Sequence, residues 1–142
     1  QIKTQARKNA REAAEDEGLD GPLQAVGRLL VAAVDGRKIV ADLEGLALVP
    51  EGDEGGWLYA SSQGDNTYMR YALPDVTPAG RFRIAAGQYG STEETDGIEA
   101  QRGDFGPNFP GGLFIAQDGV NDGRAQNFKL VPLGAIEKAL GD

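Results

Sequence analysis

The 142-residue sequence contains no cysteine and no histidine. Without cysteine the chain has no disulfide, no thiolate nucleophile, and no zinc or iron–sulfur site with sulfur ligands. Without histidine it contains neither a Ser-His-Asp triad nor an HExxH metalloprotease motif. A metal site in this chain therefore has to use oxygen ligands, which suit calcium or magnesium.

Long apolar runs and an excess of positive charge are also absent. No run approaches the roughly 20 apolar residues of a membrane span, so we expect no membrane partner. No charged-then-apolar leader opens the sequence, and it begins with Gln1 rather than Met, so we expect a processed or truncated chain without a visible signal peptide. The 22 acidic residues exceed the 14 Lys and Arg, and a net charge of -8 argues against nucleic-acid binding and against unaided binding of phosphate.

Glycine, by contrast, is abundant at 21 positions, and short apolar segments lie between turn residues. Residues 1–22 are rich in helix formers and poor in large apolar groups, which predicts a helical segment or linker. Residues 23–142 have the pattern of an antiparallel all-β fold that ends in a short helix, Pro132–Leu140. The predicted strands are Val26–Val34, Lys38–Leu48, Trp57–Ser62, Thr67–Ala72, Arg81–Ala85, Ile98–Gln101, Gly112–Gln117 and Asn127–Val131.

The β region contains an internal repeat. The segment Leu58–Gly64 is echoed by Leu113–Gly119, and Gln63 and Gln117 are 54 positions apart. A unit of about 50 residues is compatible with a propeller blade, which usually carries four strands. The first unit provides four predicted strands and the second only three. Because propellers usually need at least four blades to close, the chain is either an open sandwich or the tail of a longer protein.

Acidic residues stand where predicted strands begin. Asp42 and Glu44 are two positions apart and would share one face of a strand. Asp96 occupies the corresponding place in the second unit. One interpretation is a charged, solvated outer face. The other is a cation site, because unpaired carboxylates are costly among apolar neighbours and three converging carboxylates would bind a hard cation.

Polar residues follow the second strand of each unit. Gln63 precedes the turn residues Gly64, Asp65 and Asn66, so it either belongs to a hairpin turn or donates its amide to a bound anion. The segment Gln117–Gly123 resembles half of a calcium loop but lacks the terminal Glu and the flanking helices of an EF-hand. It is therefore either a turn or a structural calcium site.

Five blocks in the same order resemble the β-propeller phytases. They are Ala41–Leu46, Leu58–Gly64, Glu94–Glu99, Gly112–Gly119 and Gln126–Pro132. The likeness runs from about Asp35 to Gly141, and the matching blocks lie in the C-terminal part of much longer proteins. The resemblance implies that residues 23–142 are about the last two blades of a six-bladed propeller, with residues 1–22 as the preceding linker.

The resemblance also implies roles for individual residues. Asp42, Glu44 and Asp96 match calcium ligands of the family's catalytic cluster, Gln63 matches a contact to substrate phosphate, and Asn121 matches a ligand of a structural calcium. The sequence departs from the family around this last site. The loop Val120–Ala125 is shorter, and Tyr89–Glu93 replaces an aspartate-rich stretch.

By this resemblance the parent protein is a calcium-dependent phosphomonoesterase that hydrolyses phytate, myo-inositol hexakisphosphate, by metal-activated water. This chain alone would carry an incomplete site. The expected partners are inositol phosphates, and either the missing N-terminal blades or further copies bound through open sheet edges. The expected location is secreted or periplasmic. Two alternatives stay open, namely a non-catalytic, calcium-stabilised binding module and an open β-sandwich interaction domain.

Overall fold

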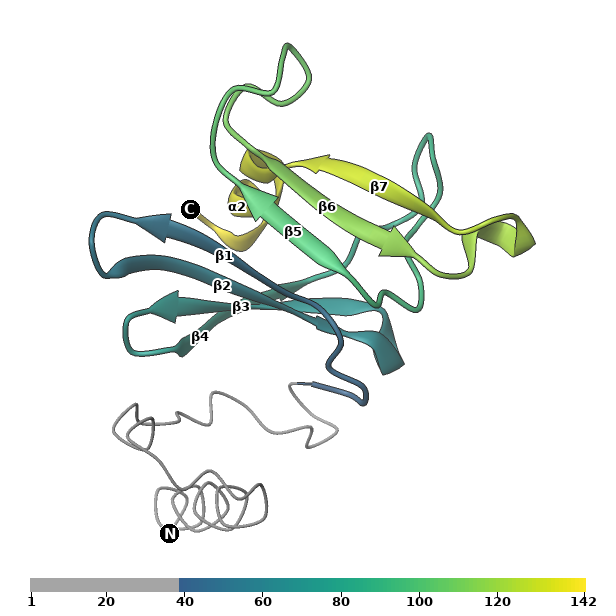
Figure 1. Ribbon diagram of the computed structural model, residues 1–142, viewed down its shortest axis with the longest axis horizontal. Coiled ribbons are helices and arrows are strands. Elements are labelled where there is room, and N and C mark those ends of the chain that lie inside the picture. The colour runs from purple at the N-terminus through teal and green to yellow at the C-terminus, as the bar shows by residue number, and fades with distance from the viewer. Residues whose placement is uncertain (1–38) are drawn as a thin grey trace, which may run out of the picture. The chain divides into compact units, whose positions relative to one another are not determined.

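The computed structural model describes residues 39–142, and the following account applies to these residues (Figure 1). They form seven strands in two antiparallel sheets, followed by one short α-helix. The all-β fold class with a short C-terminal helix is therefore confirmed. The predicted helical segment 1–22, the boundary after it and the predicted strand Val26–Val34 lie outside the described residues.

The first sheet is a four-stranded antiparallel meander. Its strands are β1 (Leu46–Glu51), β2 (Gly55–Ser62), β3 (Thr67–Leu73) and β4 (Thr77–Phe82), paired in that order. A 3₁₀ turn, η2 (Gln63–Asp65), joins β2 to β3 and ends at Asn66, whose φ of 55° is left-handed. Asparagine tolerates this conformation better than most residues. The sheet confirms the number of strands predicted for the first unit, but β1 covers Leu46–Glu51 rather than Lys38–Leu48.

The fourth strand lies earlier in the chain than the sequence pattern predicts. It runs over Thr77–Phe82 rather than Arg81–Ala85, and it includes Pro78 and Gly80. Both residues argue against a central strand, since proline cannot donate to the ladder and glycine has no side chain to pack. β4 accommodates them because it lies at the edge of the sheet, where the register with β3 also shifts between Arg70 and Tyr71.

The second sheet has three strands. They are β5 (Ile98–Gln101), β6 (Leu113–Asp118) and β7 (Asn127–Pro132), again paired in sequence order and antiparallel. A second 3₁₀ turn, η3 (Asn121–Gly123), connects β6 to β7. The sequence predicts these three strands to within one residue at each end. The two sheets correspond to the two predicted units, and they form no closed ring within residues 39–142.

Strand register shows that the repeat is structural. Leu46 pairs with Ala60 in the first sheet, and Ala100 pairs with Phe114 in the second. Both partners are thus shifted by the same 54 positions that separate Gln63 from Gln117. The same shift carries Asp42 to Asp96, so these two aspartates occupy equivalent places ahead of β1 and β5.

The core lies between the two sheets. β1 is the nearest strand of the first sheet to β5, as Figure 1 shows. The buried members include Ala47 and Val49 from β1 and Ala100 and Ala116 from the second sheet. Four aromatic rings pack around one another at the centre with centroids 5.1–6.1 Å apart, and they belong to Tyr59, Tyr68, Phe82 and Phe114. Contacts of this kind stabilise a core beyond their area of burial.

The helix α2 (Leu133–Leu140) closes one side of this core. Leu133 and Ile136 are buried and Leu140 packs beside them, a spacing that places all three on one helical face. Gly141 ends the helix in a left-handed conformation with φ 94°, as predicted. The helix has eight residues, and no helix within residues 39–142 is long and apolar enough to cross a membrane.

Ion pairs tie the C-terminal region to both sheets. The Arg70 guanidinium on β3 is 2% exposed, lies 4.0 Å from the centre of the Trp57 ring, and forms a two-bond ion pair with the Asp142 carboxylate. Arg102, which follows β5, pairs with Glu51 at the end of β1 and with Glu137 on α2. The burial of Arg70 has no counterpart in the sequence pattern, where the arginines look evenly scattered.

Candidate functional site

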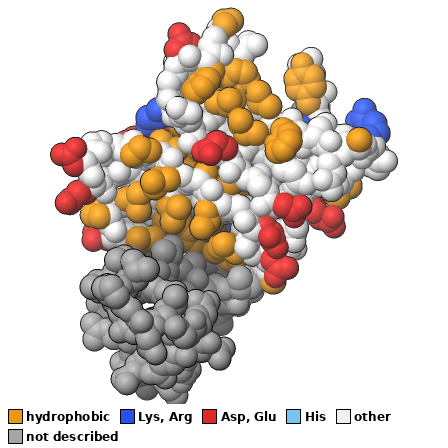
Figure 2. Space-filling view, in the orientation of Figure 1, with side chains coloured by type: hydrophobic (Ala, Val, Ile, Leu, Met, Phe, Trp, Pro, Cys, Tyr) orange, Lys and Arg blue, Asp and Glu red, His pale blue; other side chains and the backbone are white. Residues whose placement is uncertain are grey.

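Four of the predicted site residues lie near the points where the first strands of the two sheets begin. Asp42 and Glu44 precede β1, Asp96 precedes β5, and Gln63 follows β2. The three carboxylates are exposed and Gln63 is half-buried. Figure 2 shows acidic side chains gathered at this end of the described part, whereas hydrophobic side chains lie over the sheets.

The segment that carries Asp42 and Glu44 is irregular, which corrects the expectation that both lie on a strand. Residues 42–45 come before β1, so strand alternation does not set the direction of either side chain. The expected burial among apolar neighbours is also wrong, because both side chains are exposed. Their charge is therefore solvated in the described part, and the desolvation argument for a bound cation loses its force.

The end of β2 holds this irregular segment in place. The Ser61 hydroxyl accepts from the backbone N–H of Gly45 at 2.7 Å and of Glu44 at 3.3 Å. The Ser62 hydroxyl accepts from the N–H of Val40 at 2.8 Å. Both serines are fully buried. Because side chains on a rigid strand replace the missing ladder bonds, the acidic segment has a defined path.

Gln63 joins the acidic segments of the two sheets. Its backbone N–H donates to the carbonyl oxygen of Asp42 at 2.9 Å. Its side-chain Nε2 donates to Oδ1 of Asp96 at 2.7 Å. Three of the residues chosen from the sequence are therefore connected through direct hydrogen bonds. Glu44 lies two residues from Asp42, and no described residue pairs with its carboxylate.

The segment before β5 is held by side chains from the first sheet and its β2–β3 connection. Oη of Tyr68 lies 2.7 Å from the hydroxyl of Thr92 and 2.8 Å from that of Thr95, and all three residues are buried. Burial raises the pKa of Tyr68 although both threonines lower it in part. Oδ1 of Asn66 accepts the N–H of Glu94 at 2.8 Å. The sequence does not reveal these contacts, because their partners are 24 to 28 residues apart in the chain.

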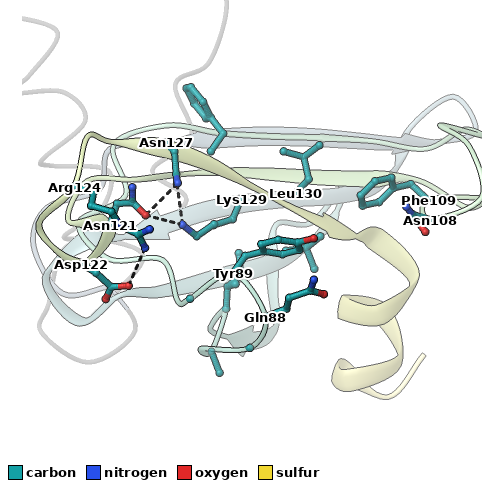
Figure 3. A pocket seen from close by; sticks show the side chains of 16 residues that line it. Gln88, Tyr89, Asn108, Phe109, Asn121, Asp122, Arg124, Asn127, Lys129 and Leu130 are labelled. Carbon is teal, nitrogen blue, oxygen red and sulfur yellow. Dashed lines mark hydrogen bonds and ion pairs between the residues drawn. The ribbon is translucent and has the colours of Figure 1, made fainter.

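Asn121 belongs to a different environment, shown in Figure 3. It lines an open groove of about 870 Å³ beside β7, and its Oδ1 accepts from Nζ of Lys129 at 3.2 Å and Nδ2 of Asn127 at 3.1 Å. Within residues 39–142 no hydrogen bond links Asn121 to Asp42, Gln63 or Asp96.

Asp118 is also committed to partners inside the protein. Its Oδ2 lies 2.9 Å from Nζ of Lys129, and its Oδ1 accepts the backbone N–H groups of Glu93, Val120 and Asn121. Burial alone would raise the pKa of Asp118, but the Lys129 ammonium and these N–H groups hold it below the ordinary value. The segment Gln117–Gly123 is thus a turn whose buried Asp118 carboxylate already has the Lys129 ammonium of β7 as its counter-ion, so this carboxylate is not free to bind calcium in this conformation. The role of Asn121 as a calcium ligand stays a prediction.

The carboxylates of the acidic segments are the right chemical type of ligand for calcium, but they are too few to complete its ligand shell. Asp42, Glu44 and Asp96 offer the hard oxygen ligands that calcium prefers. Calcium takes six to eight such ligands, and residues 39–142 contain no group of three or more acidic side chains close enough to hold one ion. These residues can supply only part of a ligand shell, so their metal and catalytic roles also stay predictions.

Comparison with known proteins gives two findings. The phytase family model matches residues 13–142. The 3-phytase of Bacillus subtilis (strain 168) is 38% identical over 119 residues, which cover 80% of this chain and 31% of the relative. The chain therefore spans about a third of the length of this curated relative. Because the family match covers most of the chain and includes both sheets with their acidic entry segments, the chain belongs to the phytase family.

Proposed function

We propose that the protein hydrolyses phosphate monoesters of phytate, and that this chain supplies one side of the site. The observation that carries the proposal is the Gln63–Asp96 hydrogen bond, which joins two equivalent acidic segments in a member of the phytase family. The bond brings an amide donor and a carboxylate together at one exposed place. An amide donor suits a phosphate oxygen, and a carboxylate suits a cation.

Gln63 is the residue of this chain that would contact the substrate. Its Nε2 carries two hydrogens, of which one is given to Asp96. No other described residue accepts from this nitrogen, so the second hydrogen is available to a phosphate oxygen. The backbone bond from Gln63 to Asp42 fixes where the amide stands relative to the acidic segment.

The carboxylates require a counter-charge before a polyanion can bind. Asp42, Glu44 and Asp96 would repel phytate, and the chain carries a net charge of -8. We therefore propose that these carboxylates contribute ligands to bound calcium without all three holding the same ion, and that the remaining ligands come from other blades. Calcium bound there would reverse the local charge and lower the pKa of an attacking water.

A chimera tests this proposal most directly. In the chimera this chain replaces the matching part of the Bacillus subtilis 3-phytase, and phosphate release from phytate is measured with calcium and with EDTA. We expect turnover only with calcium, and a loss of about 10- to 100-fold on Asp42→Asn or Asp96→Asn. Asp53→Asn, in the exposed β1–β2 turn, is the matched control. Full activity in EDTA would exclude the metal-dependent mechanism.

A second candidate function is a calcium-stabilised binding module without turnover. It is favoured for this chain in isolation because residues 39–142 supply only part of the proposed catalytic site. Under this alternative calcium raises the unfolding temperature of the isolated chain, yet the folded chimera releases no phosphate. The two measurements together separate the candidates.

We also propose partners and a location for the protein. We propose that inositol phosphates are the ligands, and that the sheet edges are covered either by the remaining blades of a longer chain or by further copies. A secreted or periplasmic location is proposed on the family resemblance alone. Fractionation of the producing cells tests it directly.

A further inference from the structure

Gln117 forms two hydrogen bonds with the backbone of Asp96 and Gly97. Its backbone N–H donates to the carbonyl oxygen of Gly97 at 2.9 Å, and its side-chain Oε1 accepts the N–H of Asp96 at 2.8 Å. β5 begins only at Ile98, so these two residues precede the paired strand. The two bonds therefore fix a stretch of backbone that the sheet itself leaves free.

The surroundings of Gln117 set the orientation of its amide. The residue lies on β6 and is 8% exposed. Its Nε2 donates to Oε1 of Gln126 at 3.2 Å, which turns Oε1 toward Asp96. Since both ends of the amide have partners, the oxygen is held in the acceptor position that Asp96 requires.

The amides of the two equivalent glutamines have different hydrogen-bond partners in the two sheets. Gln63 is half-buried and its amide reaches across to the carboxylate of Asp96. Gln117 is buried and its amide holds the backbone of that same aspartate. We propose that Gln117 is a positioning residue, which fixes the Asp96 carboxylate within reach of Gln63. The importance of this for turnover rests on the proposed function, but the positioning itself can be tested without metal or substrate.

The test compares three variants of the 142-residue chain by NMR, in the absence of calcium and phytate. Gln117→Met keeps the length of the side chain and removes the acceptor. Gln117→Glu keeps an oxygen that can accept from the Asp96 N–H. Gln101→Met, at an exposed position on β5, is the matched control. The readouts are hydrogen exchange of the Asp96 and Phe114 amides and the chemical shift of the Gln63 side-chain amide.

We expect Gln117→Met to speed exchange of the Asp96 amide at least about tenfold, with no change at the Phe114 amide in the core strand β6. The chemical shift of the Gln63 side-chain amide should change, because its hydrogen bond to Asp96 is weakened. Gln117→Glu should restore both readouts, and Gln101→Met should change neither.

Two results would overturn the inference. One is unchanged exchange of Asp96 in Gln117→Met. The other is equal acceleration at Asp96 and Phe114, which would show that Gln117 contributes only to overall stability. Neither result depends on whether the protein is a phytase, so failure of the positioning role and failure of the proposed function are distinguishable.

Discussion

Nζ of Lys129 lies 2.9 Å from Oδ2 of Asp118, and both side chains are less than a tenth exposed. Asp118 ends β6 and Lys129 lies on the neighbouring strand β7. The remaining polar atoms of the pair also have partners. Oδ1 of Asp118 accepts three backbone N–H groups, and Nζ of Lys129 donates to Asn121 and Asn127. Removing one partner of such a pair is strongly destabilising, because the other charge is left buried without its counter-ion.

Removing one partner of this pair should destabilise the protein strongly. Lys129→Met leaves the Asp118 carboxylate buried without its counter-ion, and we expect the free energy of unfolding to fall by about 3–5 kcal/mol. Urea denaturation at neutral pH measures the loss. Arg124→Met is the control, because the Arg124–Asp122 pair is exposed and worth less than about 1 kcal/mol. Similar losses in the two variants would contradict the prediction.

The same pair should make stability fall in acid. The pKa of Asp118 is below its ordinary value in the folded protein, so the unfolded chain binds the proton more readily. Its contribution to stability is complete above the unfolded pKa of about 3.9 and is lost as pH falls through the folded pKa. We expect the difference in stability between the wild type and Asp118→Asn to shrink below about pH 4. For the exposed Gln101→Met variant, which removes no titratable group, the difference should stay constant, and denaturation curves at a series of pH values show which holds.

The Tyr68 hydroxyl should be worth a measurable amount of stability. Tyr68→Phe removes the buried partner of the Thr92 and Thr95 hydroxyls, and leaving these groups undersatisfied should cost about 1–3 kcal/mol. Tyr89→Phe is the control, since Tyr89 is 75% exposed and its change should stay within about 0.5 kcal/mol. Thermal or chemical denaturation compares the two. A neutral Tyr68→Phe variant would show that solvent replaces the hydroxyl.

Gly64 should tolerate no side chain. A Cβ at this position would collide with the carbonyl oxygen of Ala41, beside Asp42, so Gly64→Ala must push the acidic segment away from η2. We expect a loss of about 1–3 kcal/mol and a displaced Asp42 amide resonance. Gly134→Ala adds a methyl group in open space on α2 and should stabilise the protein by about 0.5–1 kcal/mol. If both variants behave alike, the close approach at Gly64 is not important.

The open edge of β7 should promote self-association. Within residues 39–142 this strand pairs only with β6, and its Phe128 and Leu130 are 64% and 51% exposed. Unpaired apolar edges favour pairing with another chain. We expect concentration-dependent association in analytical ultracentrifugation that is weakened by Phe128→Lys with Leu130→Lys. Phe105→Lys, in the loop after β5, should leave it unchanged. A chain that stays monomeric at all concentrations would rule out this edge as a contact.

Strands with strong local signals could be predicted from the sequence. β5 and β7 are short segments in which polar and apolar residues alternate, and their residues match the prediction closely. β4 shows where such signals fail. Pro78 and Gly80 oppose a strand locally, but pairing with β3 at the sheet edge outweighs that preference. Pairing between strands is a tertiary effect that local composition does not contain.

In the candidate site, the residues themselves could be predicted from the sequence but the contacts that hold them could not. The repeat and the acidic motifs led to Asp42, Gln63 and Asp96, and the structure connects these three residues by hydrogen bonds. The contacts that hold them could not be predicted in the same way. Tyr68 reaches Thr92 and Thr95 only because the chain folds back on the first sheet. The amide of Gln117 differs from that of Gln63 in its burial and in its hydrogen-bond partners. These partners become visible once the fold has brought distant strands together.

The pairing of Arg70 with Asp142 has a consequence for the order in which the chain is synthesised. Arg70 lies in the middle of the first sheet, but its carboxylate partner follows 72 residues later, after the whole of the second sheet. A ribosome therefore releases all four strands of the first sheet before the buried guanidinium can find its counter-ion. The first sheet cannot reach its final charge balance before the second sheet and α2 have been synthesised, so the two sheets complete their folding together.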